Sequence, residues 1–289
     1  MSEVFAVIVT YNPVLENVKR LFERLRESEV FVIVIDNSNP EVDLSLPEGC
    51  VVRRLGENLG IATAQNIGIK TALNMGARKI VFFDQDTRLS TDFIKNILKT
   101  FNDFSVKIAA PVFYDNEKTF GYKLVDIGRF GFRKKISPET MSSEIDISVA
   151  ISSGTVVDVD VFEKVGYMDE SLFIDYVDTE WCLRCFSHGI KVRVNPRAVM
   201  HHSIGDNSIS FLGFNIPVHS PVRRYYRVRN SLLLLRMRHI PIALSLREVL
   251  FAVVHQFIIV CTQSNKRDYV NFFVKAVIDG VRNRRGALS

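Results

Sequence analysis

The sequence has little cysteine, and the few cysteines are scattered. They are Cys50, Cys182, Cys185 and Cys261. Only Cys182 and Cys185 stand close together, and no second pair completes a zinc-binding pattern. This usage excludes a disulfide-stapled secreted domain and predicts ordinary buried thiols in a reducing compartment.

A targeting segment is also lacking. The residues up to Thr10 carry no basic region and no small-residue cleavage site, and they lead directly into a strand pattern. We therefore expect no signal peptide and a cytoplasmic protein.

Long apolar runs are scarce as well. The strongly apolar stretch 249–261 is interrupted by His255 and Gln256, and it is shorter than the roughly 20 residues that a membrane-spanning helix needs. We therefore expect it not to cross a bilayer. It could instead lie on a membrane surface, pack against a second subunit in a homodimer, or pack in the core.

Acidic residues are rare near the C-terminal end. Between residues 223 and 289 they are only Glu248, Asp268 and Asp279, whereas arginine and lysine are abundant, and the whole chain carries a net charge of +5. This excess indicates an anionic partner, such as nucleic acid, a phospholipid surface or a diphosphate-linked substrate. We expect a globular domain over residues 1–222 and a basic, partly apolar helical region over residues 223–289.

What the sequence does contain is an alternation of short apolar runs with helical patterns. The expected strands are 4–9, 30–35, 51–55 and 79–83, and the expected helices follow the first, third and fourth of them at 15–25, 61–75 and 90–101. Asn12 is expected to cap the first helix, with Pro13 as its first residue. The alternation predicts an α/β fold with a doubly wound sheet.

Acids follow two of these strands. Asp84 and Asp86, separated by Gln85, come directly after the fourth strand, and Asp36 follows the second. The carboxyl ends of parallel strands share one edge of a sheet, so we expect Thr10, after the first strand, beside Asp36. Two carboxylates at i and i+2 can converge on one divalent cation that keeps positions open for phosphate oxygens, although a polar turn would look similar.

Two glycines stand where close approach of a ligand would be useful. Gly60 opens the expected helix 61–75, whose first N–H groups would be free to face a nucleotide. Gly154, in the stretch 152–155, would let the backbone approach a ligand closely.

Taken in order, these motifs resemble the family-two glycosyltransferases of the GT-A fold. The resemblance is carried by Thr10-Tyr11-Asn12, Asp36-Asn37, Asn58-Leu59-Gly60, Asn66 with Gly68, and Asp84-Gln85-Asp86. The wording of residues 84–87 and 173–182 is most similar to the bacterial rhamnosyltransferases, and the resemblance covers nearly the whole chain.

The resemblance implies a role for each motif. Asp36 would meet the nucleotide base, Asp84 and Asp86 would hold Mg²⁺ or Mn²⁺ on the donor diphosphate, and His201, preferred over His202, would be a third metal ligand. The implied nucleotide- and donor-binding residues are Thr10, Tyr11, Asn12, Asp36, Asn58, Gly60, Asn66, Asp84, Gln85, Gly154 and Arg229. The arginines from Arg223 to Arg229 could hold a phosphate, or they could form a solvated helix face.

Inverting sugar transfer needs one carboxylate base to take the proton of the acceptor hydroxyl. The resemblance places Asp178 at the position of this base, with Asp175 and Glu180 as rivals. The chain departs from the family's usual Glu-Asp pair by having Val177 before Asp178, so the alternatives stay open. The acids could also complement the dipole of a helix that starts here.

We therefore expect an inverting, metal-dependent glycosyltransferase. Its implied donor is dTDP-L-rhamnose, and its implied acceptor is a lipid-diphosphate-linked saccharide of a bacterial surface polysaccharide such as O-antigen or capsule. It would act in the cytoplasm, at the inner face of the cell membrane, with no nucleic acid as partner. The alternatives are a UDP-hexose donor, a non-catalytic nucleotide-binding subunit, or a nucleotidyltransferase; the last is disfavoured because no glycine- and lysine-rich phosphate loop follows the first strand.

Overall fold

The structure is a computed structural model that describes residues 3–39, 44, 46–114, 120–201, 208–211 and 214–288; of 208–211 and 214–217 it describes the backbone alone. The strand-and-helix alternation expected for the first hundred residues is confirmed. The strands are β1 (Val4–Thr10), β2 (Phe31–Asp36), β3 (Cys50–Arg54) and β4 (Lys79–Asp84), and the helices are α1 (Leu15–Glu27), α2 (Ile61–Asn74) and α3 (Phe93–Lys99). The four strands are parallel, in the order β3-β2-β1-β4.

The second half of the sheet is mixed. Beyond β4 lie β10 (Val156–Asp158), β6 (Ile108–Tyr114), β11 (Val192–His201) and the short β5 (Arg88–Leu89), while β9 (Ile145–Ile147) pairs with β11 off this path. β10 runs antiparallel to both β4 and β6, whereas β11 is parallel to β6. The sheet is therefore mixed and doubly wound, as expected.

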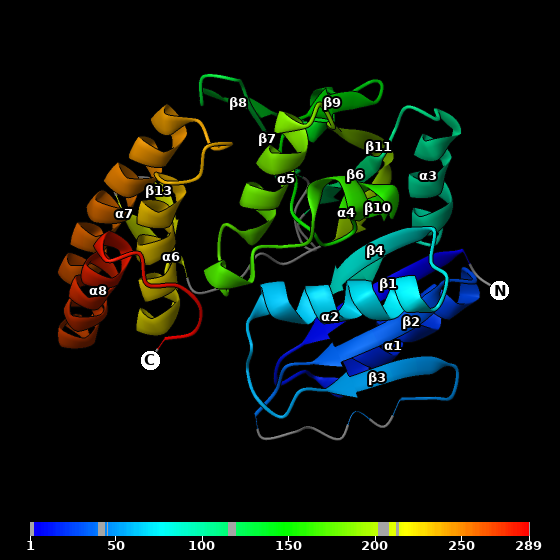
Figure 1. The fold of residues 1–289 in the computed structure, drawn as a ribbon, viewed down its shortest axis with the longest axis horizontal. Helices are drawn as coiled ribbons and strands as arrows, with labels where there is room; N and C mark the ends of the chain where they lie inside the picture. Colours follow the sequence, from blue (N-terminus) through cyan, green and yellow to red (C-terminus); the bar gives the residue numbers. More distant parts are fainter. Residues whose placement is uncertain are drawn as a thin grey trace.

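Helices cover both faces of this sheet (Figure 1). One core is formed with α2, α4 (Asp160–Val165) and α5 (Val177–Ser187), and the other with α1 and α3. Strands buried on both faces explain why β1, β2 and β4 are apolar throughout instead of alternating. The polar residues at their carboxyl ends are left at the rim.

Smaller elements complete the chain. They are the hairpins β7 (Leu124–Ile127) with β8 (Arg133–Ile136) and β12 (Ser208–Phe211) with β13 (Phe214–Pro217), and the 3-10 turns Thr100–Asn102, Pro138–Thr140 and Glu170–Leu172. The C-terminal helices α6 (Pro221–Leu234), α7 (Ile242–Thr262) and α8 (Lys266–Val281) lie side by side at one end of the molecule (Figure 1). The expected helical region is present, and its division from residues 1–222 stays a prediction.

The expected start of the first helix was wrong. Asn12 does not cap α1, which starts at Leu15 after Val14; Asn12 has φ 46°, and its N–H donates to Ser38 Oγ at 2.8 Å. Farther along the chain, β11 is one continuous strand, and its register with β6 shifts between Val194 and Val199. Pro196 lies in that shift, where a residue without an N–H is tolerated.

The apolar helix near the C-terminal end is longer than the sequence suggested. α7 spans 21 residues, so by length and composition it could cross a membrane. One face of α7, however, packs against the rest of the protein. Leu244, Glu248 and Ala252 on this face are buried, and Gln256 donates to the Tyr269 carbonyl at 2.8 Å. The other face remains apolar and exposed.

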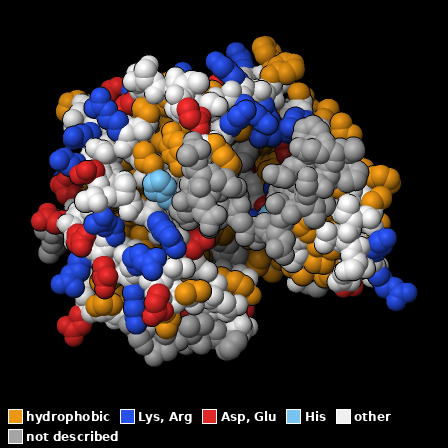
Figure 2. Space-filling view, turned by 180° about the vertical axis from the view of Figure 1, so that it is seen from behind, with side chains coloured by type: hydrophobic (Ala, Val, Ile, Leu, Met, Phe, Trp, Pro, Cys, Tyr) orange, Lys and Arg blue, Asp and Glu red, His pale blue; other side chains and the backbone are white. Residues whose placement is uncertain are grey.

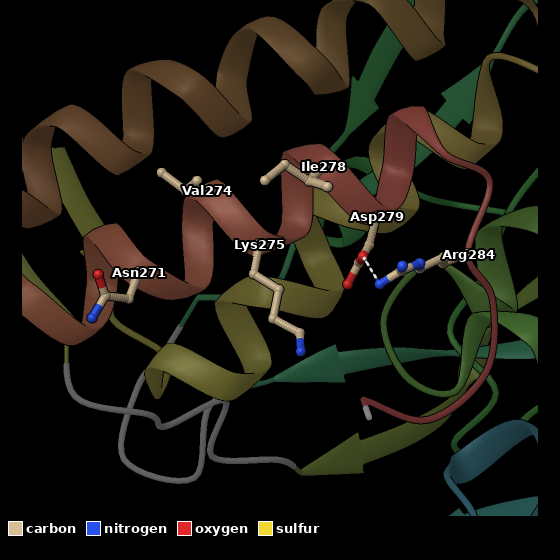
Figure 3. A pocket seen from close by; sticks show the side chains of 6 residues that line it. All are labelled: Asn271, Val274, Lys275, Ile278, Asp279 and Arg284. Carbon is tan, nitrogen blue, oxygen red and sulfur yellow. Dashed lines mark hydrogen bonds and ion pairs between the residues drawn. The ribbon is translucent and has the colours of Figure 1, made fainter.

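A depression of about 380 Å³ lies on α8, lined by Asn271, Val274, Lys275, Ile278, Asp279 and Arg284 (Figure 3). Asp279 and Arg284 form an ion pair at 3.1 Å along its edge. None of the site residues expected from the sequence lines it, so the candidate site lies elsewhere.

Candidate active site

The carboxyl ends of β1 and β2 place Thr10 beside Asp36, as expected from parallel pairing. The Thr10 hydroxyl donates to Asp36 Oδ1 at 2.9 Å, and the Ser38 hydroxyl donates to the same oxygen at 2.6 Å. Both Thr10 and Asp36 are fully buried. Asp36 Oδ2, however, is buried with no hydrogen-bond partner among the described residues. A buried carboxylate oxygen without a donor is costly, so this atom is suited to accept a hydrogen bond from a ligand.

Gln85 holds the loop after β1 in place. Its Oε1 accepts the Tyr11 N–H at 2.7 Å, and its Nε2 donates to the Tyr11 carbonyl at 3.2 Å. The Tyr11 side chain is 48% exposed beside this contact. Gln85 thus joins the acid turn after β4 to the loop after β1, beside which Tyr11 is open to solvent.

The loop before α2 is tied to the loop after β2. Asn37 donates to Asn58 Oδ1 at 2.9 Å, and the same oxygen accepts the Gly60 N–H at 3.0 Å. The Ile61 N–H donates to the Phe173 carbonyl at 2.8 Å. These first N–H groups of α2 are therefore paired within the protein, contrary to the expectation that they are free.

Gly60 and Gly154 owe their identity to packing. Both have positive φ, and a Cβ on Gly60 would lie 2.6 Å from the Phe173 carbonyl oxygen, while one on Gly154 would lie 2.0 Å from the Met200 sulfur. The close approach at Gly154 is thus to Met200 of β11, and its contact with a donor sugar stays a prediction.

Two more residues expected to contact the donor are used inside the protein. The Asn66 side chain is 2% exposed and bonds to the backbone of Met168 and to Glu170. Arg229 is 1% exposed, and its guanidinium donates to Asn230 and to carbonyls that include Leu172. Both side chains are therefore engaged inside the protein, and their contact with the donor stays a prediction.

The acid turn stands at the end of β4. Asp84 is partly buried, and Asp86 is exposed. His201 is exposed at the end of β11, where it pairs in register with Arg88 of β5. Across the described part of the chain, no three His, Cys, Asp or Glu side chains gather into a metal-binding group. His202 lies outside the described residues.

A serine turn joins this acid turn to Asp178. Ser153 Oγ accepts the Asp84 N–H at 3.3 Å and lies 3.2 Å from Thr87 Oγ1. The neighbouring Ser152 N–H donates to Asp178 Oδ2 at 3.1 Å. The sequence drew attention to this turn for its glycine, but it did not indicate that the two serines hydrogen-bond to Asp84 and to Asp178.

Asp178 is held in an environment that disfavours its charge. Burial raises the pKa of its carboxyl to about 6; the Ser152 N–H opposes the rise, and the negative charge of Asp84 adds to it. Two acids from different elements thus interact across the site. A carboxyl with a pKa near neutrality is suited to proton transfer.

The two rivals of Asp178 are engaged elsewhere. Glu180 is 2% exposed and pairs with Arg184 at 2.8 Å and with His239 at 2.7 Å. Asp175 faces the guanidinium groups of Arg223 and Arg227 at 3.6 and 3.7 Å. Of the three acids, the geometry favours Asp178 as the base.

The backbone before Asp178 has an unusual conformation. Phe173, Asp175 and Tyr176 all have φ between 63° and 66°, a region that L-residues rarely adopt. The side-chain amide of Asn230 donates to the carbonyls of Leu172, Ile174 and Asp175 at 2.8–3.0 Å. α6 therefore holds the segment that leads into α5, a role that the sequence motif Arg229-Asn230 did not reveal.

The fold and these paired acids define the class of the protein, a GT-A glycosyltransferase. The chain belongs to glycosyl transferase family 2, because residues 5–166 match that family description. It is also 49% identical over 288 residues to the dTDP-rhamnosyl transferase RfbF of Shigella flexneri, a match that covers 99% of this chain and 97% of that protein.

Solved structures share the fold at low identity. S. aureus TarS 1–349 in complex with UDP-GlcNAc has a TM-score of 0.58 at 12% identity, covering 98% of this chain and 82% of that one. GalNAc-T7 with UDP, GalNAc and Mn²⁺ has a TM-score of 0.57 at 15% identity, covering 97% of this chain and 57% of that one. At such identities the likeness shows the fold alone.

Proposed function

We propose that this glycosyltransferase moves L-rhamnose from dTDP-L-rhamnose to a saccharide acceptor with inversion at the anomeric carbon. The observation that carries the donor assignment is the 49% identity, over nearly the full length of both chains, to a protein named a dTDP-rhamnosyl transferase. The acceptor is a lipid-linked saccharide of a surface polysaccharide, and the protein acts in the cytoplasm at the membrane surface. The exposed apolar face of α7 supports this location.

The nucleotide would lie over the carboxyl ends of β1 and β2. The unpaired Oδ2 of Asp36 is placed to accept the imide N–H of a thymine or uracil base, and Tyr11 offers its exposed ring beside it. Thr10 and Ser38 keep the Asp36 carboxylate oriented by occupying its other oxygen. Since thymine and uracil share this imide and cytosine lacks it, the contact would favour thymidine and uridine diphosphates without choosing between these two.

Asp84 and Asp86 are the proposed ligands of Mg²⁺ or Mn²⁺. Two carboxylate groups form a hard donor set that fits such a cation, with remaining positions left for diphosphate oxygens. When bound, the cation would neutralise the charge that develops on the departing nucleoside diphosphate. His201 is not proposed as a ligand, since the structure does not gather it with the two acids.

Asp178 would act as the base. Its carboxylate takes the proton of the acceptor hydroxyl while the hydroxyl oxygen attacks the anomeric carbon of the sugar. The bond from that carbon to the diphosphate oxygen breaks, and dTDP leaves with the electron pair. The Ser152 N–H orients the Asp178 carboxylate. The acceptor oxygen attacks from the face of the sugar opposite the diphosphate, which inverts the anomeric carbon.

A thermal-shift screen tests the donor assignment. We expect dTDP with Mn²⁺ to raise the melting temperature more than UDP with Mn²⁺, and more than dTDP with a chelator, because a ligand that binds only the folded state stabilises it. A larger shift with UDP would assign a UDP-hexose donor. No shift with either nucleotide would favour a non-catalytic subunit.

The pH profile tests the role of Asp178. A base with a pKa of about 6 is active when deprotonated, so kcat/KM should be level above that pH and fall about tenfold for each pH unit below it. Asp84 contributes to the raised pKa, so Asp84→Asn should move this limb to lower pH. An unchanged slope in Asp178→Asn would assign the limb to another group.

A further inference from the structure

Glu248 of α7 lies at the centre of a polar contact between three elements. Its carboxylate accepts hydrogen bonds from Arg247 at 2.6 Å, from the Tyr176 hydroxyl at 3.0 Å and from Arg133 of β8 at 3.2 Å. Tyr176 stands two residues before Asp178. One carboxylate thus holds two guanidinium groups next to the segment that carries the base.

A second such contact lies beside the first. Asp175 faces both Arg223 and Arg227 of α6, and the Arg227 guanidinium also lies 5.3 Å from the centre of the Tyr176 ring. The buried Arg224 adds another charge: burial, and then the charge of Arg227, lower the pKa of Arg224 to about 10.

Positive charge therefore exceeds negative charge in this cluster. Even without Arg223, the cluster contains four arginines and, among the described residues, only two carboxylates. The arginines are Arg133, Arg224, Arg227 and Arg247, and the carboxylates are Asp175 and Glu248. Burial is the main reason why the pKa of Arg133 is lowered; the nearby Glu248 opposes this change, and repulsion from the charges of Arg247 and Arg227 adds to it. An anion bound here would relieve this repulsion.

The arginine side chains can reach such an anion. Those of Arg133, Arg247 and Arg227 are 29%, 35% and 38% exposed. Lysine and arginine side chains also gather beside the central hollow of the molecule (Figure 2). Guanidinium groups match the geometry of phosphate oxygens, which makes a phosphate the fitting ligand.

The position of the cluster identifies which phosphate it would take. The loops proposed to bind the nucleotide follow β1, β2 and β4. The arginines instead come from β8, α6 and α7, and they lie beside the segment that leads to Asp178, the proposed base. Arg247 lies 4.2 Å from the centre of the Phe251 ring, and Leu246, Leu250 and Phe251 are more than half exposed on α7. An apolar surface thus adjoins the charged one.

We propose that Arg133, Arg227 and Arg247 bind the phosphate or diphosphate group of a lipid-linked acceptor, with the lipid chain leaving along the exposed face of α7. This inference rests on the proposed function for its acceptor, but the site itself is defined by its own charges. The arginines position the acceptor hydroxyl at Asp178 by anchoring the group to which the saccharide is attached.

Calorimetric titration of the full-length protein with farnesyl diphosphate, a soluble prenyl diphosphate, tests the proposal. The titration is done with dTDP and Mg²⁺ present, so that the donor diphosphate site is filled, and is repeated without them. We expect Arg133→Gln and Arg227→Gln each to weaken binding by about tenfold. Both variants should fold, because Arg247 still pairs with Glu248 and Arg223 still faces Asp175.

The matched control is Arg238→Gln, an exposed arginine of the same basic region, which should leave binding unchanged. Unchanged binding in Arg133→Gln and Arg227→Gln, or an equal loss of dTDP affinity in them, would overturn the acceptor site. Inorganic pyrophosphate should bind about tenfold more weakly than farnesyl diphosphate, and equal affinity would overturn the role of the lipid. A failure of dTDP to bind counts against the proposed donor alone, because the loss of farnesyl diphosphate affinity in Arg133→Gln and Arg227→Gln can still be measured without nucleotide.

Discussion

Asp178→Asn should lower the transfer rate by about a thousandfold while making the protein more stable. The rate falls because the amide cannot take the proton of the acceptor hydroxyl. The stability rises for a separate reason. The pKa of Asp178 is raised to about 6 in the folded protein, so its negative charge destabilises the folded state at every pH above that value. This destabilisation disappears as the pH falls through 6 toward the ordinary pKa that the Asp178 carboxyl has in the unfolded chain.

At pH 7.5 the amide removes that cost, which should increase the free energy of unfolding by about 1–3 kcal/mol. The asparagine side-chain oxygen can still accept the Ser152 N–H. Turnover and denaturant unfolding, measured on the same preparation, check both effects. Near-normal turnover would move the role of base to Asp175.

Glu180→Gln provides the opposite pattern as a control. It removes the charge that pairs with Arg184 and His239 in a buried setting, so the free energy of unfolding should fall by about 3–5 kcal/mol. The rate per folded molecule should stay within about tenfold of the original, because Glu180 takes no part in proton transfer. If Glu180→Gln instead lost activity and gained stability, the role of base would belong to Glu180 and not to Asp178.

Replacing both Asp84 and Asp86 by asparagine should abolish the effect of divalent cations. We expect turnover to fall by about a hundred- to a thousandfold, since the leaving diphosphate loses the cation that offsets its charge. The shift in melting temperature caused by dTDP should become the same with Mn²⁺ and with a chelator. Asp36 and Tyr11 are intact in this variant, so part of the nucleotide affinity should remain.

The control for this pair is Asp92→Asn, an exposed acid a few residues along the chain whose side chain makes no cap hydrogen bond to α3. Its dependence on Mn²⁺ should match that of the unaltered protein. A double variant that keeps its Mn²⁺-dependent shift would place the metal elsewhere, and one that keeps full turnover would argue for catalysis without these acids.

The sequence alone determined the parallel half of the sheet and its rim. Apolar runs such as Val4–Thr10 and Lys79–Asp84 are buried on both faces, and this requirement is written locally in their composition. Parallel pairing then places the carboxyl ends of neighbouring strands together, so the sequence predicts Thr10 beside Asp36, as the structure confirms. The sequence motifs around Asp84 and Asp178 likewise indicated the family, because such motifs are short, contiguous stretches of sequence.

Only the tertiary structure decided which polar side chains are available to a ligand. Asn66 and Arg229 stand in motifs that resemble donor-binding residues, yet their hydrogen bonds are spent on backbone groups brought to them by distant segments. Tertiary contacts likewise favour Asp178 among the three acids, because Asp175 faces arginines from α6 and Glu180 pairs with Arg184 and His239. The role of Asp178 as the base stays a prediction. Burial and pairing depend on contacts far apart in the chain, and a sequence pattern records only which groups exist, not which of them are already satisfied.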